Sequence, residues 1–102
     1  MSWAAPHVAS LQHGRHVQFR PRGGSMAGRV ESGQLVTVAP LPPHATPQPG
    51  QVVLCKVKGN YYLHLVKQVR ADGGCLIGNN RGGVNGWTSR RNVYGVLTKV
   101  EP

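Results

Sequence analysis

A serine that follows two glycines and a histidine in an apolar run are the residues of this chain best suited to nucleophilic chemistry. Ser25 follows Gly23 and Gly24, which let the backbone approach a substrate closely and leave the Ser25 N–H as a candidate oxyanion donor. A serine hydroxyl is a poor nucleophile at neutral pH and needs an adjacent base. His64 lies in the apolar stretch 63–66, and an imidazole with a pKa of about 6.5 can accept the serine proton at pH 7.

Lys67 is the competing base, three residues after His64. In a regular strand this odd spacing points the two side chains to opposite faces, so only one of them can face Ser25. His64 would share its face with Val66. Lys67 would share the other face with Val69. The structural alternatives are that Ser25 is a turn residue and that His64 is a histidine packed in the core. Contact between the two side chains would favour the catalytic roles over these structural ones.

Short apolar runs separated by Gly, Pro and Asn predict the elements that must position these residues. The expected strands cover residues 16–19, 35–38, 52–57, 61–69, 75–77 and 93–100. Residues 40–49 hold five prolines and are expected to form an extended loop. Residues 78–91, rich in Gly, Asn and Arg, are expected to form a second loop. Residues 27–31 are a candidate for one helical turn. The pattern predicts an all-β domain over residues 16–102, a small sandwich or partly open barrel, preceded by a loose N-terminal arm over residues 1–15.

Composition limits the function classes further. The chain has 102 residues, enough for one small domain, and 12 Lys+Arg against 3 Asp+Glu give a net charge of +9. No run approaches the ~18 apolar residues of a membrane span, and residues 1–16 do not resemble a secretory signal, so we expect a cytoplasmic protein. Cys55 and Cys75 are expected to be reduced core thiols, and the five histidines have no zinc-ligand spacing, so neither a metal nor another cofactor is predicted.

The serine segment also matches a known motif. Gly24-Ser25-Met26, with Gly33 eight residues after the serine, resembles the nucleophile motif G-S-M-x-P-x-x-x-x-G-D. That motif belongs to the serine peptidase superfamily of type I signal peptidases and LexA-like self-cleaving repressors. Gly28 stands where the motif has proline, and Gln34 stands where it has aspartate.

Four further matches follow in the family's order. Gly50–Val53 is similar to the second strand of the family, G-D-V-V, and Leu63–Val66 lies where the family carries its base. Gly78–Arg81 resembles the G-D-N-R box, and Tyr94–Val96 resembles the closing strand. The resemblance spans about residues 16–100. It implies the family's β fold, a Ser25/His64 dyad with Gly23, Gly24 and Met26 in the substrate loop, and a peptide substrate that binds as an added strand.

Aspartates are missing from the matched positions. The resemblance would place an aspartate at each of five positions, which here are Gln34, Gln51, Asn79, Gly82 and Gly86. Restoring all five would lower the net charge from +9 to +4. A histidine base needs a partner that holds its tautomer, so Asn79, Asn80 or a backbone carbonyl is expected to replace the acid. A slow or inactive enzyme of the same fold stays open.

The second function hypothesis is a non-catalytic β module. Its arginines lie in two loops, Arg15, Arg20, Arg22 and Arg29 around the serine and Arg81, Arg90 and Arg91 in the later loop. If both loops meet at one end of the sheet, they form a basic face for nucleic acid or an acidic protein. The alternative is an ordinary solvated surface.

Overall fold

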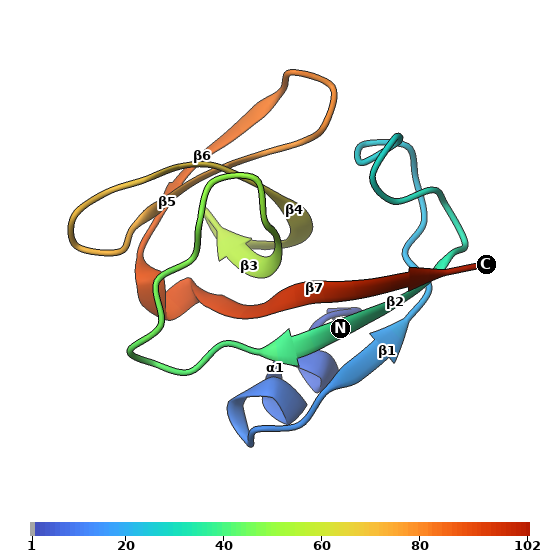
Figure 1. Ribbon diagram of the computed structural model, residues 1–102, viewed down its shortest axis with the longest axis horizontal. Coiled ribbons are helices and arrows are strands. Elements are labelled where there is room, and N and C mark those ends of the chain that lie inside the picture. The colour runs from blue at the N-terminus through green and yellow to red at the C-terminus, as the bar shows by residue number, and fades with distance from the viewer. Residues whose placement is uncertain (1) are drawn as a thin grey trace.

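A computed structural model describes residues 2–102 as one antiparallel sheet with a short helix packed against it (Figure 1). The elements are α1 (Ala5–Gln12), β1 (Val17–Phe19), β2 (Leu35–Pro40), β3 (Val52–Val57), β4 (Asn60–Val69), β5 (Cys75–Gly78), β6 (Val84–Thr88), a 3-10 turn (Arg90–Asn92) and β7 (Val93–Glu101). The strand order is β1-β2-β7-β3-β4-β5-β6, which leaves β1 and β6 as free edges. The prediction of an all-β fold is confirmed.

The central strands bury both of their faces. On β3, Val52 and Leu54 belong to one apolar cluster, while Val53 and Cys55 belong to a second cluster on the other side of the sheet. This is why residues 52–57 read as a continuous apolar run rather than as an alternating one. Cys55 and Cys75 are free, buried thiols, as expected, and burial raises the pKa of Cys55 to about 12.

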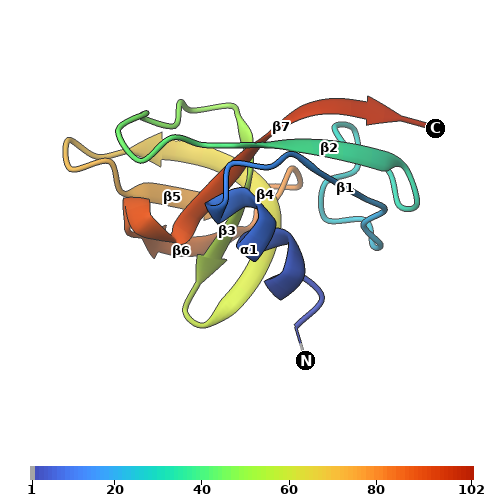
Figure 2. The same cartoon turned by 90° about the horizontal axis from the view of Figure 1, so that it is seen from below.

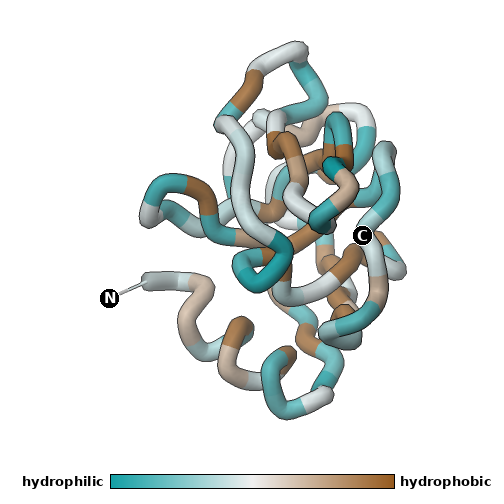
Figure 3. The backbone as a smooth tube through the Cα atoms, turned by 90° about the vertical axis from the view of Figure 1, so that its left-hand side faces the viewer, coloured by the Kyte–Doolittle hydropathy of each residue, from teal (hydrophilic) through white to brown (hydrophobic). Residues whose placement is uncertain are grey.

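The N-terminal segment differs from the prediction. Residues 5–12 form α1, which contacts β1, β2 and β7, so the expectation of a loose arm over residues 1–15 is wrong for the described residues 2–15. Figure 2 shows the helix lying along the sheet, and Figure 3 shows hydrophobic segments on it. Ala4, Val8 and Leu11 are buried in the first cluster at helical spacing. No helix within residues 2–102 is long and apolar enough to cross a membrane.

The later loop also differs. Its second half forms β6, which pairs with β5 and brings residue 85 into the sheet, so the prediction of a loop over residues 78–91 is wrong there. Glycines at positions 82, 83 and 86 hid this strand, because glycine is disfavoured in strands. Residues 27–31 form successive turns rather than a helix, with the N–H groups of Arg29 and Val30 both donating to the oxygen of Met26.

Candidate active site

The structure brings Ser25 and His64 into hydrogen-bond contact. Ser25 lies in the loop between β1 and β2, and His64 lies in the middle of β4. Ser25 Oγ is 3.0 Å from His64 Nε2. Ser25 is exposed, whereas the His64 side chain is buried, so the hydroxyl lies between solvent and a shielded imidazole. The predicted meeting of these two residues, 39 positions apart, is confirmed.

Asn85 on β6 is the second hydrogen-bond partner of the imidazole. His64 Nδ1 lies 2.7 Å from Asn85 Oδ1. An amide oxygen only accepts hydrogen bonds, so Nδ1 must carry the imidazole proton in this arrangement. The lone pair of Nε2 is then directed at Ser25 Oγ. Asn85 therefore holds the tautomer in which His64 acts as a base toward the serine.

The environment of His64 keeps the imidazole neutral. Burial lowers the pKa of His64 below its usual value of 6.5, and the hydrogen bond to Asn85 partly opposes this shift. The Tyr62 ring contributes to the burial, with its centroid 4.8 Å from that of His64. A neutral imidazole at pH 7 is the protonation state that a general base needs.

The serine loop is held in place from two sides. Met26 and Val30 are buried in the first apolar cluster and anchor the loop from below. Asn80, in the turn between β5 and β6, holds it laterally. The Asn80 backbone N–H donates to the backbone carbonyl oxygen of Ser25 at 2.9 Å. The Asn80 side-chain Nδ2 donates to the backbone carbonyl oxygen of Ala27, also at 2.9 Å. Asn80 therefore holds the position of the Ser25 loop.

Asn79 shapes the turn that carries Asn80. Its side-chain oxygen accepts hydrogen bonds from the N–H groups of Arg81 and Gly83, at 2.9 and 2.8 Å. Neither Asn79 nor Asn80 contacts His64 through a hydrogen bond, so the expectation that one of them holds its tautomer is wrong. Both act on the loop geometry instead.

The backbone around the serine is suited to an oxyanion. Gly23 has a φ of 104°, a conformation that side-chain-bearing residues rarely adopt, and it turns the chain just before the serine. Gly24 has open space on its side-chain position apart from the Arg81 guanidinium, 3.6 Å from where a Cβ would lie. No hydrogen bond within residues 2–102 uses the Ser25 N–H, so this donor is free for a substrate oxygen.

Lys67 does not take part in this cluster. It lies at an irregularity in the pairing of β4 with β5, between Val66 and Gln68. The irregularity breaks the alternation beyond Val66, so Val69 packs in the same apolar cluster as Val66 instead of on the opposite face. The Lys67 stem runs beside Gly78, where its Cε would crowd a Cβ at 2.7 Å. Among the hydrogen bonds of residues 2–102, none joins Lys67 to Ser25.

A cleft of about 680 Å³ opens beside the Ser25/His64 pair. Gly23, Ser25 and Met26 form its rim and floor on the serine side, and Leu63 and His64 form the β4 side. Four aromatic residues also line it, namely Trp3, Phe19, Tyr61 and Tyr62. Ser25 and His64 therefore face an accessible cleft with a mostly apolar surface.

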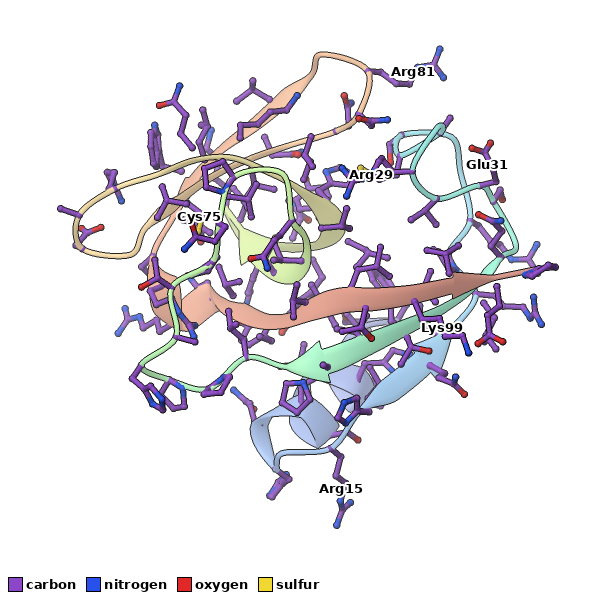
Figure 4. The ribbon with its side chains drawn as sticks, viewed as in Figure 1. Arg15, Arg29, Glu31, Cys75, Arg81 and Lys99 are labelled. Atoms are coloured by element: carbon purple, nitrogen blue, oxygen red, sulfur yellow. The ribbon has the colours of Figure 1, made fainter. Side chains whose placement is uncertain are left out.

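Arginines near the serine loop line the cleft, hold the loop, or do both, and Arg20 does both because it also donates to the Gly33 backbone oxygen at 2.8 Å. Arg20 and Arg22 line the cleft, and both are exposed. Arg29 donates to the Gly50 oxygen at 3.1 Å and so ties the loop to the start of β3. Figure 4 shows Arg29 and Arg81 at the same end of the molecule.

The remaining arginines do not join them. Arg90 is a structural residue whose guanidinium donates to the backbone oxygens of Pro42, Ala45 and Val93, at 2.6, 2.8 and 2.9 Å. Arg91 lines a different cavity from the one that contains Ser25. Arg15 lies at the end of the molecule opposite Arg81 (Figure 4). The expected single basic face is therefore wrong, because Arg15, Arg90 and Arg91 lie elsewhere.

Within residues 2–102, no three His, Cys, Asp or Glu side chains gather closely enough to hold a metal ion. A comparison with known protein families and with curated proteins finds no family model and no curated protein that matches this chain.

Proposed function

We propose that the protein is a serine endopeptidase that cleaves extended peptides with Ser25 as nucleophile, His64 as general base and Asn85 as the residue that orients the imidazole. The observation that carries the proposal is the continuous hydrogen-bonded chain from Asn85 Oδ1 through the His64 ring to Ser25 Oγ. This is the nucleophile–base–orienter arrangement of hydrolases that act through a serine.

The reaction follows from the positions of these atoms. Ser25 Oγ attacks the scissile carbonyl carbon, and its proton passes to His64 Nε2. The Ser25 N–H stabilises the oxygen that becomes negative. The tetrahedral intermediate then collapses, the C–N bond breaks, and the imidazolium gives its proton to the leaving amine. Water, deprotonated by His64, hydrolyses the acyl-enzyme and restores Ser25.

The ordered motifs support a place in the signal-peptidase and LexA-like superfamily. The serine loop and the Gly78–Arg81 turn, two of the matched motifs, contact each other through Asn80. Asn85 directly precedes Gly86, the last position at which the family pattern has an aspartate. Gly28 adopts a φ of 94°, which proline cannot adopt, so this serine loop follows a backbone path that the family's proline-containing loop could not.

The competing reading is an inactive module of the same fold. It is disfavoured by the tautomer of His64, because a merely structural Ser–His contact needs no third residue that protonates Nδ1 and frees Nε2. Binding of nucleic acid through one arginine face is disfavoured by the engagement of Arg90 with three backbone oxygens.

The proposal is tested by peptide turnover. The purified protein is incubated with a mixture of synthetic peptides, and the products are identified by mass spectrometry. We expect Ser25→Ala and His64→Ala to lower kcat/KM by about 10³-fold or more, since each removes one member of the reacting pair. Lys67→Ala is the matched control and should retain activity within about threefold. Cleavage that survives Ser25→Ala would contradict the proposal, and so would loss of cleavage in the Lys67→Ala control alone.

A further inference from the structure

The residues that line the cleft indicate which substrate side chain it binds. This inference rests on the proposed function. We infer that the N-terminal segment is a specificity element, and that the cleft binds a bulky apolar side chain of the substrate peptide against Trp3 and Phe19. The sequence pattern assigned this segment to a loose arm. In the structure it forms one wall of the cavity that contains Ser25 and His64.

The first wall consists of three packed rings, from Trp3 just before α1, His7 of α1 and Phe19 of β1. The Phe19 ring packs against the Trp3 ring with centroids 5.5 Å apart, and against the His7 ring with centroids 4.6 Å apart. All three rings line the cleft. Val8 and Leu11 bury the helix in the core and thus fix the position of this wall relative to Ser25.

The opposite wall is also apolar. Tyr61, Tyr62 and Leu63 of β4 line the cleft, and Met26 forms its floor beside the nucleophile. A volume of about 680 Å³ is in the range of sites that bind drug-sized groups, roughly 300–1,000 Å³. A substrate with only methyl-sized side chains would leave most of these aromatic surfaces unfilled. A phenylalanine or leucine side chain would remove them from water.

The exposure of Trp3 points the same way. Trp3 is 50% exposed and Trp87 is 39% exposed, so the chain holds two tryptophans of comparable exposure. The ring of Trp87 is covered by the Arg70 guanidinium, 4.6 Å from its centroid. Among residues 2–102 no arginine or lysine lies over the Trp3 ring. Trp3 therefore presents an uncovered aromatic surface inside the cleft, which is where a ligand would cover it.

Cleavage of matched peptides tests the inference in the active protein. The products of the peptide mixture first locate the subsite, and a pair of peptides with phenylalanine or alanine there is then compared. We expect the wild type to favour phenylalanine by about 10-fold or more in kcat/KM. Trp3→Ala should lower this preference by at least about fivefold. Trp87→Ala is the matched control and should keep the wild-type preference.

Binding to an inactivated protein separates this inference from the proposed function. Ser25→Ala protein is titrated with a blocked alanine pentapeptide carrying a central phenylalanine, and with its all-alanine counterpart. We expect only the phenylalanine peptide to shift the amide NMR resonances of residues 3, 4, 5, 7 and 19, and the additional Trp3→Ala change to abolish these shifts. If the wild type cleaves nothing but these shifts occur, the proposed cleavage is wrong, and the binding of a bulky apolar side chain at Trp3 and Phe19 is supported on its own. No phenylalanine preference in cleavage or binding, or a preference unchanged by Trp3→Ala, would overturn the inference.

Discussion

The two long irregular segments of the molecule are held in place by different means. The proline-rich segment, residues 41–51, closes over the Arg90 guanidinium, which binds two of its backbone oxygens and the Val93 oxygen. The serine segment, residues 20–34, is anchored by buried Met26 and Val30 and by Asn80, and leaves Ser25 exposed. In the first segment a side chain fills the centre of the loop. In the second, Ser25 stays exposed beside a cleft.

Arginines have different contacts in these two segments of a protein whose net charge is +9. Arg90 serves the fold, because its planar guanidinium donates to three backbone carbonyls, two of them in the proline-rich segment. Arg20 and Arg22 line the cleft beside Ser25, where Arg20 also donates to the Gly33 backbone oxygen. A basic composition therefore does not by itself indicate a nucleic-acid surface, since residues of one type perform separate tasks in the two regions.

The largest effect on stability is expected at the proline-rich segment. Arg90→Ala removes three hydrogen bonds from a charged donor and should lower the free energy of unfolding by about 2–3 kcal/mol, as measured by urea denaturation. At temperatures where the variant remains folded, kcat/KM should change by less than about threefold. Arg91→Ala, at an exposed neighbouring residue, is the control and should change stability by less than about 0.5 kcal/mol. Equal destabilisation by the two substitutions would refute the distinction between the segments.

The next effect concerns the pH dependence of the site. Because burial lowers the pKa of His64, kcat/KM should fall with decreasing pH only below 6.5, where the imidazole gains a proton. The same protonation should destabilise the fold as the pH falls from 6.5 through the His64 pKa, since the unfolded chain binds the proton more readily.

Asn85→Asp sharpens this test. A carboxylate at Nδ1 favours the imidazolium, so the acid limb of the kcat/KM profile should move up by about 1–2 pH units. The free energy of unfolding should no longer fall as the pH drops below 6.5, because the pKa of His64 would no longer be depressed. An unmoved acid limb in Asn85→Asp would mean that the group titrating in the profile is not His64.

The smallest effect is expected at the lateral anchor of the serine segment. Asn80→Ala removes the side-chain hydrogen bond to the Ala27 oxygen but keeps the backbone bond to Ser25. One neutral hydrogen bond is worth about 1 kcal/mol, so kcat should fall by roughly fivefold. KM should change less, because Asn80 does not line the cleft. A change in KM alone would assign Asn80 to substrate binding rather than to positioning.

Local patterns in the sequence were sufficient for the core of the site. Alternation and apolar runs located most strands, and motif order paired Ser25 with His64 across 39 positions. The environment of Lys67 could not be predicted in the same way, because strict alternation does not anticipate the irregularity between Val66 and Gln68. The sequence therefore selected the residue that contacts Ser25, whereas the irregularity at Lys67 is visible only in the pairing of β4 with β5.

Features that depend on distant partners were missed. The helix α1 is short, and Ala4, Val8 and Leu11 become recognisable as a buried stripe only when β1, β2 and β7 cover them. The glycine-rich strand β6 forms because β5 pairs with it, and local propensity argues against it. Asn85 could not be identified before β6 was known. The only available signal was its place next to Gly86, where the family pattern has an acid.

The central claim is that Ser25 is a nucleophile activated by His64, and covalent labelling tests it most directly. The protein is treated with a fluorophosphonate, which loses fluoride as Ser25 Oγ bonds to phosphorus and the serine proton passes to His64. Peptide mapping by mass spectrometry then identifies the modified residue. The account predicts one adduct on Ser25 in the wild type and in Lys67→Ala, and none in Ser25→Ala or His64→Ala. An unlabelled wild type, or labelling of Ser25 that is equally fast in His64→Ala, would contradict it.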